Sequence, residues 1–226
     1  MLRLLLNGSP RGKDGNSRKL LSWIAQGLEQ AGVSAPPIAD LAPDPTGTAI
    51  VQAFLQADEV VIALPLYTDS MPAIVKAFFE SVAEAEPARL RGKRVAFVVQ
   101  SGFPEAIHTE VLADYFARLC ERLGFHHLGT IRKGGIESIR MLPAKAVEKT
   151  AAQFRDAGKQ LAEQGAFSPD LQAAMAGPRT FGRFARLVLR ILVATGLGNY
   201  YWNTQLKKHK AFARRFDAPY APAYRP

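Results

Sequence analysis

The chain has 226 residues, of which 48% are hydrophobic and 22% are charged. This composition is typical of a folded globular protein and excludes disordered and fibrous chains. The formal net charge of +9 is concentrated at one end, because ten Lys and Arg but only one acid, Asp217, occur from Pro178 onward. Residues 1–177 hold 19 basic and 19 acidic side chains, so we do not expect this neutral part to bind nucleic acid.

A single cysteine, Cys120, excludes an internal disulfide framework and any metal cluster held by several cysteines of the chain. Its apolar, helical surroundings predict a buried thiol that acts as a small hydrophobe, which fits a reducing compartment. Residues 1–6 have the pattern of a strand and leave no room for a signal peptide. We therefore expect the protein to be cytoplasmic.

Short apolar runs alternate with longer stretches of helical periodicity up to residue 164. Strands are expected at residues 3–6, 33–38, 59–65, 94–100 and 125–131, and helices at residues 17–31, 49–56, 72–84, 105–123 and 143–164. The run Val60 to Leu64 is apolar throughout, as is typical of a strand buried on both faces. This alternation predicts an α/β fold with a doubly wound, five-stranded parallel sheet, whose ligand lies beyond the carboxyl ends of the strands.

The loop after the first expected strand runs from Asn7 to Ser17 and combines glycines, hydroxyls and a guanidinium at the start of a helix. Such a loop is suited to a phosphate group. It has neither the Gly-Lys-Ser/Thr of a P-loop nor a GxGxxG sequence, so ATP and classical dinucleotide folds are poor fits. The alternative is an ordinary connecting turn in which Asn16 or Ser17 caps the helix.

The loop after the third expected strand places an aromatic ring and polar groups where a flat heteroaromatic ligand would lie. Together, the GSPR…GNS loop and the segment PLYTDSMPAIVKAFFE resemble the NAD(P)H-dependent FMN reductase family of flavodoxin-like proteins over residues 1–165. The resemblance implies the strand order 2-1-3-4-5. It also implies that the FMN phosphate is held by Ser9, Arg11, Asn16 and Ser17, and that the isoalloxazine lies along Pro65, Leu66, Tyr67, Thr68, Asp69 and Ser70.

Two further loops complete the predicted site. Ser101, Gly102 and Phe103 follow the fourth strand, where similar proteins approach the flavin ring or its ribityl chain, although an ordinary turn is the alternative. Lys133-Gly134-Gly135 follows the fifth strand and is a candidate for the rim. His126 and His127 adjoin on a strand and point to opposite faces, and His108 falls in the first turn of a helix, so structural or surface roles are expected for all three.

The resemblance implies an FMN-dependent oxidoreductase that takes electrons from NAD(P)H and passes them to a small-molecule acceptor. The acceptor could be a quinone, a nitro or azo compound, another flavin or a metal ion. No catalytic side chain is required, because flavin N5 carries the chemistry. Two alternatives stay open: a flavodoxin-type electron carrier without turnover of its own, and a flavin-free protein that acts at a membrane surface or in an interaction.

Gly and Pro residues interrupt the helical pattern between residues 167 and 179, which predicts an FMN-binding domain at 1–166 and a basic helical extension at 167–226. In the extension, an apolar face is formed by Phe184, Leu187, Val188, Ile191 and Leu192, while Arg183, Arg186 and Arg190 lie together opposite it. The apolar face could pack on the chain's own first domain or on a second subunit in a homodimer, since related reductases are commonly dimeric. Alternatively, it could lie on an anionic membrane.

Overall fold

The computed structural model describes residues 1–34, 36–85, 87–139 and 142–218. The chain divides into two compact units, Met1–Thr180 and Phe181–Pro226, and each unit is described by itself. The first unit extends past residue 166, the domain boundary expected from the sequence pattern.

A five-stranded parallel sheet forms the centre of the first unit. Its strands are β1 (Arg3–Asn7), β2 (Ile38–Asp40), β3 (Glu59–Pro65), β4 (Arg94–Gln100) and β5 (His126–Lys133). They pair in the order β2-β1-β3-β4-β5, and every pairing is parallel. The structure therefore confirms the predicted α/β fold and its strand order. In this arrangement the chain reverses its direction of winding between β1 and β3, and ligands of doubly wound folds bind at such a switch point.

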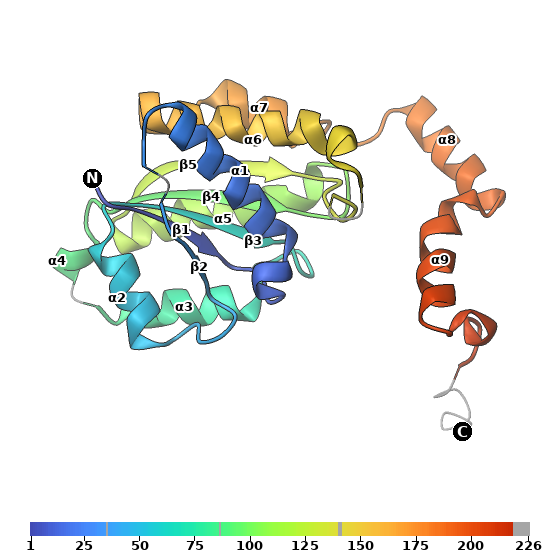
Figure 1. The fold of residues 1–226 in the computed structure, drawn as a ribbon, viewed down its shortest axis with the longest axis horizontal. Helices are drawn as coiled ribbons and strands as arrows, with labels where there is room; N and C mark the ends of the chain where they lie inside the picture. Colours follow the sequence, from blue (N-terminus) through green and yellow to red (C-terminus); the bar gives the residue numbers. More distant parts are fainter. Residues whose placement is uncertain (35, 86, 140–141, 219–226) are drawn as a thin grey trace. The chain divides into compact units, whose positions relative to one another are not determined.

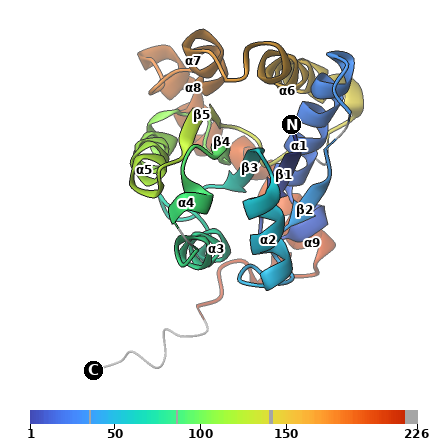
Figure 2. The same ribbon diagram turned by 90° about the vertical axis from the view of Figure 1, so that its left-hand side faces the viewer.

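Helices cover both faces of the sheet, as Figures 1 and 2 show. Helices α1 (Asn16–Gln30) and α6 (Ala144–Gln164) lie on one face. On the other face lie α2 (Thr48–Gln56), α3 (Ala73–Ala83) and α5 (Ile107–Leu123). The five long helices expected from the sequence are all present. A further short helix, α4 (Pro87–Leu90), was not predicted, because a single turn is too short to show periodicity.

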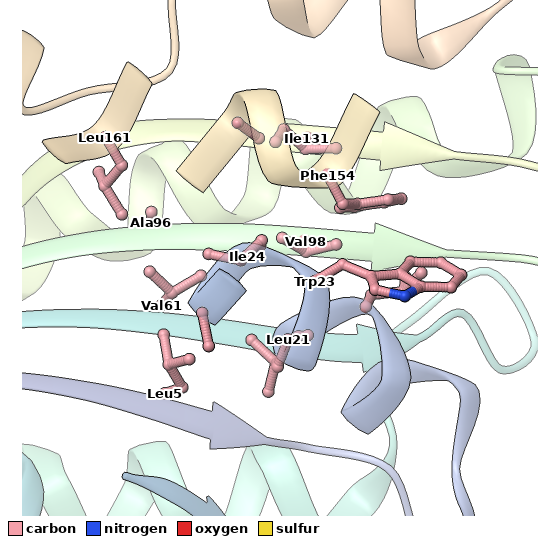
Figure 3. Packing of buried hydrophobic residues seen from close by; sticks show 14 of the residues in the cluster. Leu5, Leu21, Trp23, Ile24, Val61, Ala96, Val98, Ile131, Phe154 and Leu161 are labelled. Atoms are coloured by element: carbon pink, nitrogen blue, oxygen red, sulfur yellow. The ribbon is translucent and has the colours of Figure 1, made fainter. Parts of the chain in front are cut away.

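Two hydrophobic clusters form the core, one on each face of the sheet. Since successive side chains of a strand alternate between faces, Leu5 and Val61 contact the helices α1 and α6, while Leu4 and Val60 contact the opposite layer. Figure 3 shows Trp23, Ile24 and Phe154 of these two helices above the sheet. This packing explains why the strand sequences are apolar at consecutive positions.

The second strand is the one element whose predicted position was wrong. Residues 33–38 were expected to form it, but β2 begins only at Ile38 and ends at Asp40. Val33 follows the end of α1 and is tied to it, because its amide donates to the carbonyl of Leu28 at 2.9 Å. Pro36 and Pro37 have no amide hydrogen to donate to a neighbouring strand, so pairing with β1 starts after them.

An additional helix, α7 (Pro169–Ala176), covers the edge strand β5. Ser168 caps it by accepting a hydrogen bond from the amide of Leu171 at 3.2 Å. Phe167 and Met175 are buried in the same cluster as α1 and α6. The side chain of Gln172 accepts a hydrogen bond from the amide of Thr130 at 2.9 Å, at the free edge of β5. Residues 167–176 are therefore part of the first unit's core.

The second unit is helical, as predicted for the extension. It contains α8 (Arg183–Ala194), α9 (Tyr200–Lys208) and two 3₁₀ turns, Leu197–Asn199 and Phe212–Arg214. None of these four elements contains a buried residue. Across the described parts of the chain, no helix combines the length and the apolar character needed to cross a bilayer.

Cys120 lies in α5 with a side chain that is 1% exposed. Burial raises the pKa of this thiol to about 12. Since the thiolate is the reactive form of cysteine, the expectation that Cys120 acts as a buried small hydrophobe is confirmed.

Candidate functional site

Asn7, at the end of β1, organises the loop that follows it. Its buried side-chain amide donates to the carbonyl of Gly12 at 2.8 Å and to the carboxylate of Asp40 at 2.7 Å, while its Oδ1 accepts from the amide of Ser9 at 3.2 Å. The amide of Gly8 donates to the carbonyl of Ala63 in β3 at 2.8 Å. The loop is thus fixed to the carboxyl ends of β1, β2 and β3.

Ser9 and Gly15 bring the two halves of this loop together. The Ser9 hydroxyl accepts a hydrogen bond from the amide of Arg11 at 3.3 Å. A β-carbon added to Gly15 would lie only 2.4 Å from Ser9 Oγ, so no other residue fits here without moving the buried Ser9. Ser9, which was expected to hold the phosphate, therefore packs against Gly15 and lies next to the start of α1.

Helix α1 begins with a residue that supplies no side-chain cap. Its N-cap is Gly15, so the alternative in which Asn16 or Ser17 caps the helix is wrong. The first amides of a helix have no partner within the helix and carry its positive dipole end. An uncapped start at the carboxyl edge of a parallel sheet is an arrangement that binds anions, and phosphates above all.

Asn16 and Ser17 each bury a polar atom that has no hydrogen-bond partner. The Asn16 amide group donates to the carbonyls of Ile136 at 3.0 Å and Glu137 at 3.4 Å, which fixes its orientation and leaves Oδ1 without a donor. Ser17 Oγ is buried without a partner as well. Leaving such groups unpaired costs about 1–3 kcal/mol each. A bound ligand with both donor and acceptor groups would remove this cost.

Arg11, the cation expected to hold the phosphate, lies at the outer side of the loop. Its guanidinium is 3.3 Å from the carboxylate of Glu137, in an ion pair whose side chains are about half exposed, at 53% and 47%. An exposed pair of this kind contributes little to stability and can exchange partners. Arg11 is therefore close to the start of α1 but is held by a competing carboxylate.

The loop after β3 forms a tight two-residue turn. Tyr67 and Ser70 exchange backbone hydrogen bonds at 2.9 and 3.0 Å. Between them, Thr68 and Asp69 adopt φ angles of 49° and 59°. Positive φ is costly for residues with a β-carbon, and most of all for a branched one such as Thr68. Strained backbone of this kind is concentrated at ligand sites, and Tyr67 is exposed beside it.

The loops after β4 and β5 are joined directly. The amide of Ser101 donates to the carbonyl of Lys133, and the amide of Gly135 donates to the carbonyl of Phe103. A β-carbon at Gly134 would lie 2.4 Å from that same carbonyl oxygen, so only glycine allows this approach. The backbone of Leu66, at the end of β3, is in turn bonded to the carbonyl of Gln100.

These contacts place the four predicted loops along one edge of the sheet. Thirteen residues were expected to bind the cofactor. Five of them are buried (Ser9, Asn16, Ser17, Pro65, Ser101), one is half-buried (Leu66), and seven are exposed (Arg11, Tyr67, Thr68, Asp69, Ser70, Gly102, Phe103). Three residues that reasoning from the sequence missed are Asn7, Ile136 and Glu137. The last two follow the fifth strand, so the rule that ligands lie beyond strand ends could have indicated them.

His127 has the structural role expected of it. Its Nε2 lies 2.9 Å from the hydroxyl of Thr130, and burial lowers its pKa. His126 is exposed on the opposite face of the strand. Within the described residues, no group of three or more His, Cys, Asp and Glu side chains could hold a metal ion.

A family model described as the flavodoxin-like fold matches residues 1–161. The chain belongs to the flavodoxin-like fold family. This match covers β1 to β5 and nearly all of α6, and it confirms the flavodoxin-like fold that the loops after β1 and β3 indicated. Among curated proteins, none is significantly similar to this chain in sequence.

Solved structures with the same fold include three oxidoreductases. An FMN-dependent NADH-azoreductase from Bacillus anthracis, solved with FMN, is 17% identical with a TM-score of 0.57; the match covers 72% of this chain and 100% of that one. An NAD(P)H:quinone oxidoreductase from Methanothermobacter marburgensis is 16% identical, with a TM-score of 0.56 and coverage of 71% and 96%. An NADH:FMN oxidoreductase, in its apo form, is 18% identical, with a TM-score of 0.55 and coverage of 75% and 92%.

Proposed function

We propose that this chain binds FMN at the joined loops after β1, β3, β4 and β5 and works as an NAD(P)H-dependent oxidoreductase. The observation that carries the proposal is the pair of buried, unpartnered atoms, Asn16 Oδ1 and Ser17 Oγ, at the uncapped start of α1. A phosphate bound here would accept hydrogen bonds from the Ser17 hydroxyl and from the first amides of the helix. The Asn16 oxygen requires a donor, which a ribityl hydroxyl would supply.

The remaining loop residues fit the rest of the cofactor. The exposed Tyr67 and the turn through Thr68 and Asp69 offer an aromatic face and backbone polar groups to a flat ring. Gly102 has no side chain to prevent close approach, since a β-carbon there would meet only Glu137, at 3.6 Å. The redox chemistry, hydride transfer from NAD(P)H and electron transfer to an acceptor, is supplied by FMN when it is bound.

The structural neighbours support this class of reaction, because they include an azoreductase, a quinone oxidoreductase and an NADH:FMN oxidoreductase. For this chain, the acceptor is accordingly a small molecule such as a quinone, a nitro or azo compound, a flavin or a metal ion. A homodimer, which the family resemblance implied, stays a prediction for this chain.

An electron carrier is the second candidate, and it differs from a reductase in one measurable step. We expect NADH or NADPH, mixed anaerobically with the FMN-loaded protein, to bleach the flavin absorbance within seconds, and a quinone to restore it. Each cycle should then oxidise one nicotinamide. A flavin that dithionite reduces but neither nicotinamide reduces would assign the chain to the carriers.

Arg11→Ala tests the predicted role of the guanidinium. Charge-assisted hydrogen bonds to phosphate contribute about 1.5–3 kcal/mol. We expect the contribution of Arg11 to lie at the lower end of this range, because its side chain is half-exposed and is paired with Glu137 in the free protein. We therefore expect FMN affinity to fall about 10-fold and riboflavin affinity to stay the same. The matched control is Glu137→Gln, which should raise FMN affinity by releasing Arg11. Equal losses for FMN and riboflavin in Arg11→Ala would show that Arg11 only supports the loop.

A further inference from the structure

Helix α8 of the second unit is strongly amphipathic. Arg183, Arg186 and Arg190 are spaced by three and four residues and share one face. Apolar side chains occupy the rest of the helix surface and are exposed: Phe184 is 80% and Val193 70% exposed. A helix with an apolar face requires a partner that covers it. None of its residues is buried within the unit.

The segment that follows α8 continues the same pattern. Tyr200 and Trp202 are exposed aromatic side chains at the start of α9, and Lys207 and Lys208 end it. The ring of Phe212, after α9, has two cations beside it: those of Lys207 and Arg215 lie 5.0 and 4.1 Å from its centre. Aromatic rings beside clustered cations are typical of segments that lie at a membrane–water interface.

The charge of the second unit decides between possible partners. Residues 181–226 contain nine Lys and Arg and one acid, Asp217, which pairs with Arg214 at 2.8 Å. Two copies of this unit repel each other, and interface cores between proteins are depleted of charge. The first unit offers no acidic excess to attract it, since residues 1–177 are neutral. Nucleic acid would satisfy the cations and would leave the apolar face of α8 uncovered.

We propose that residues 181–218 form an anchor that lies on an anionic phospholipid surface. The apolar face of α8 enters the boundary between head groups and acyl chains, while the arginines and the lysines of α9 contact lipid phosphates. With 12 residues, α8 is about 18 Å long and lies in the surface, because crossing the hydrocarbon layer takes about 30 Å. This anchoring is independent of the proposed reductase activity.

Vesicle sedimentation of the full chain tests the anchor directly, without any turnover assay. We expect the protein to sediment with vesicles of phosphatidylcholine and phosphatidylglycerol, and to stay in solution with phosphatidylcholine alone. Since each basic residue near the surface contributes about 5-fold in affinity, the triple variant R183E/R186E/R190E should bind about 100-fold more weakly or worse. The matched control R118E/R122E/K145E changes three exposed residues of the first unit and should bind normally.

Trp202 gives a second readout, because the other tryptophan, Trp23, is 7% exposed and belongs to the core. The fluorescence emission of Trp202 should shift to the blue when anionic vesicles are added, and Trp202→Phe should abolish this shift. Equal losses in both triple variants would overturn the proposal, and so would sedimentation that does not depend on phosphatidylglycerol. The proposal would also fail if R183E/R186E/R190E still bound vesicles but lost dimerisation or binding to duplex DNA.

Discussion

Replacing Ser17 with alanine should weaken FMN binding and should leave the FMN-free protein equally or more stable. The hydroxyl of Ser17 is buried without a partner, so its removal relieves a desolvation cost of about 1 kcal/mol or more in the free protein. In the proposed FMN complex, the same hydroxyl would donate to the phosphate. Its loss should raise the dissociation constant of FMN about 10- to 100-fold, as expected for a hydrogen bond to a charged group.

Thermal unfolding and flavin titration of the same variant give the two measurements. The matched control is Ser22→Ala on the same helix, whose hydroxyl already donates to the carbonyl of Lys19 at 2.7 Å. This control should lose a little stability and keep its FMN affinity. If Ser17→Ala destabilised the free protein and bound FMN normally, the hydroxyl would have a structural partner and no role at the phosphate.

Gly27→Val should cost more stability than any surface change, because α1 and α6 touch through their backbones. A β-carbon at Gly27 would lie 1.9 Å from the carbonyl oxygen of Arg155, and one at Gly158 would lie 2.2 Å from that of Ile24. Overpacking of this kind costs about 3 kcal/mol. In a domain of this size we expect the melting temperature to fall by about 6–12 °C.

The control for Gly27→Val is Gln26→Val, at the neighbouring exposed position of α1. Gln26→Val introduces the same branched side chain, with its low helix propensity, at a position where it does not collide with the backbone of α6. The melting temperature of this variant should therefore change by only about 1–2 °C. Equal effects of the two variants would contradict the close crossing of α1 and α6.

The fold could be predicted from the sequence because β1, β3 and β4, the three strands inside the sheet, are apolar runs. The exception is β2, where two prolines displaced the pairing, and an edge strand of three residues has no periodicity to read. Helix α7 was missed for another reason: Gly165 and Pro169 indicate breaks in a helix, but not that the chain folds back onto β5.

The candidate site could be predicted at the level of loops, since the carboxyl ends of parallel strands share one edge. The individual contacts could not. The amide of Asn16 is fixed by a carbonyl 120 residues away, and Arg11 pairs with a carboxylate 126 residues away. Such pairs depend on how two loops meet after the sheet has formed, and no local pattern encodes this. The positive φ of Thr68 is equally invisible, because threonine rarely adopts it.

Titration of the purified full chain with FMN and with riboflavin tests the central claim most directly. We expect one FMN to bind per chain with a dissociation constant of about 1 μM or lower. Riboflavin should bind at least about 10-fold more weakly, because it lacks the phosphate that we propose the start of α1 to hold. Bound FMN should also raise the melting temperature. No binding at about 100 μM FMN, or equal affinity for the two flavins, would contradict the account.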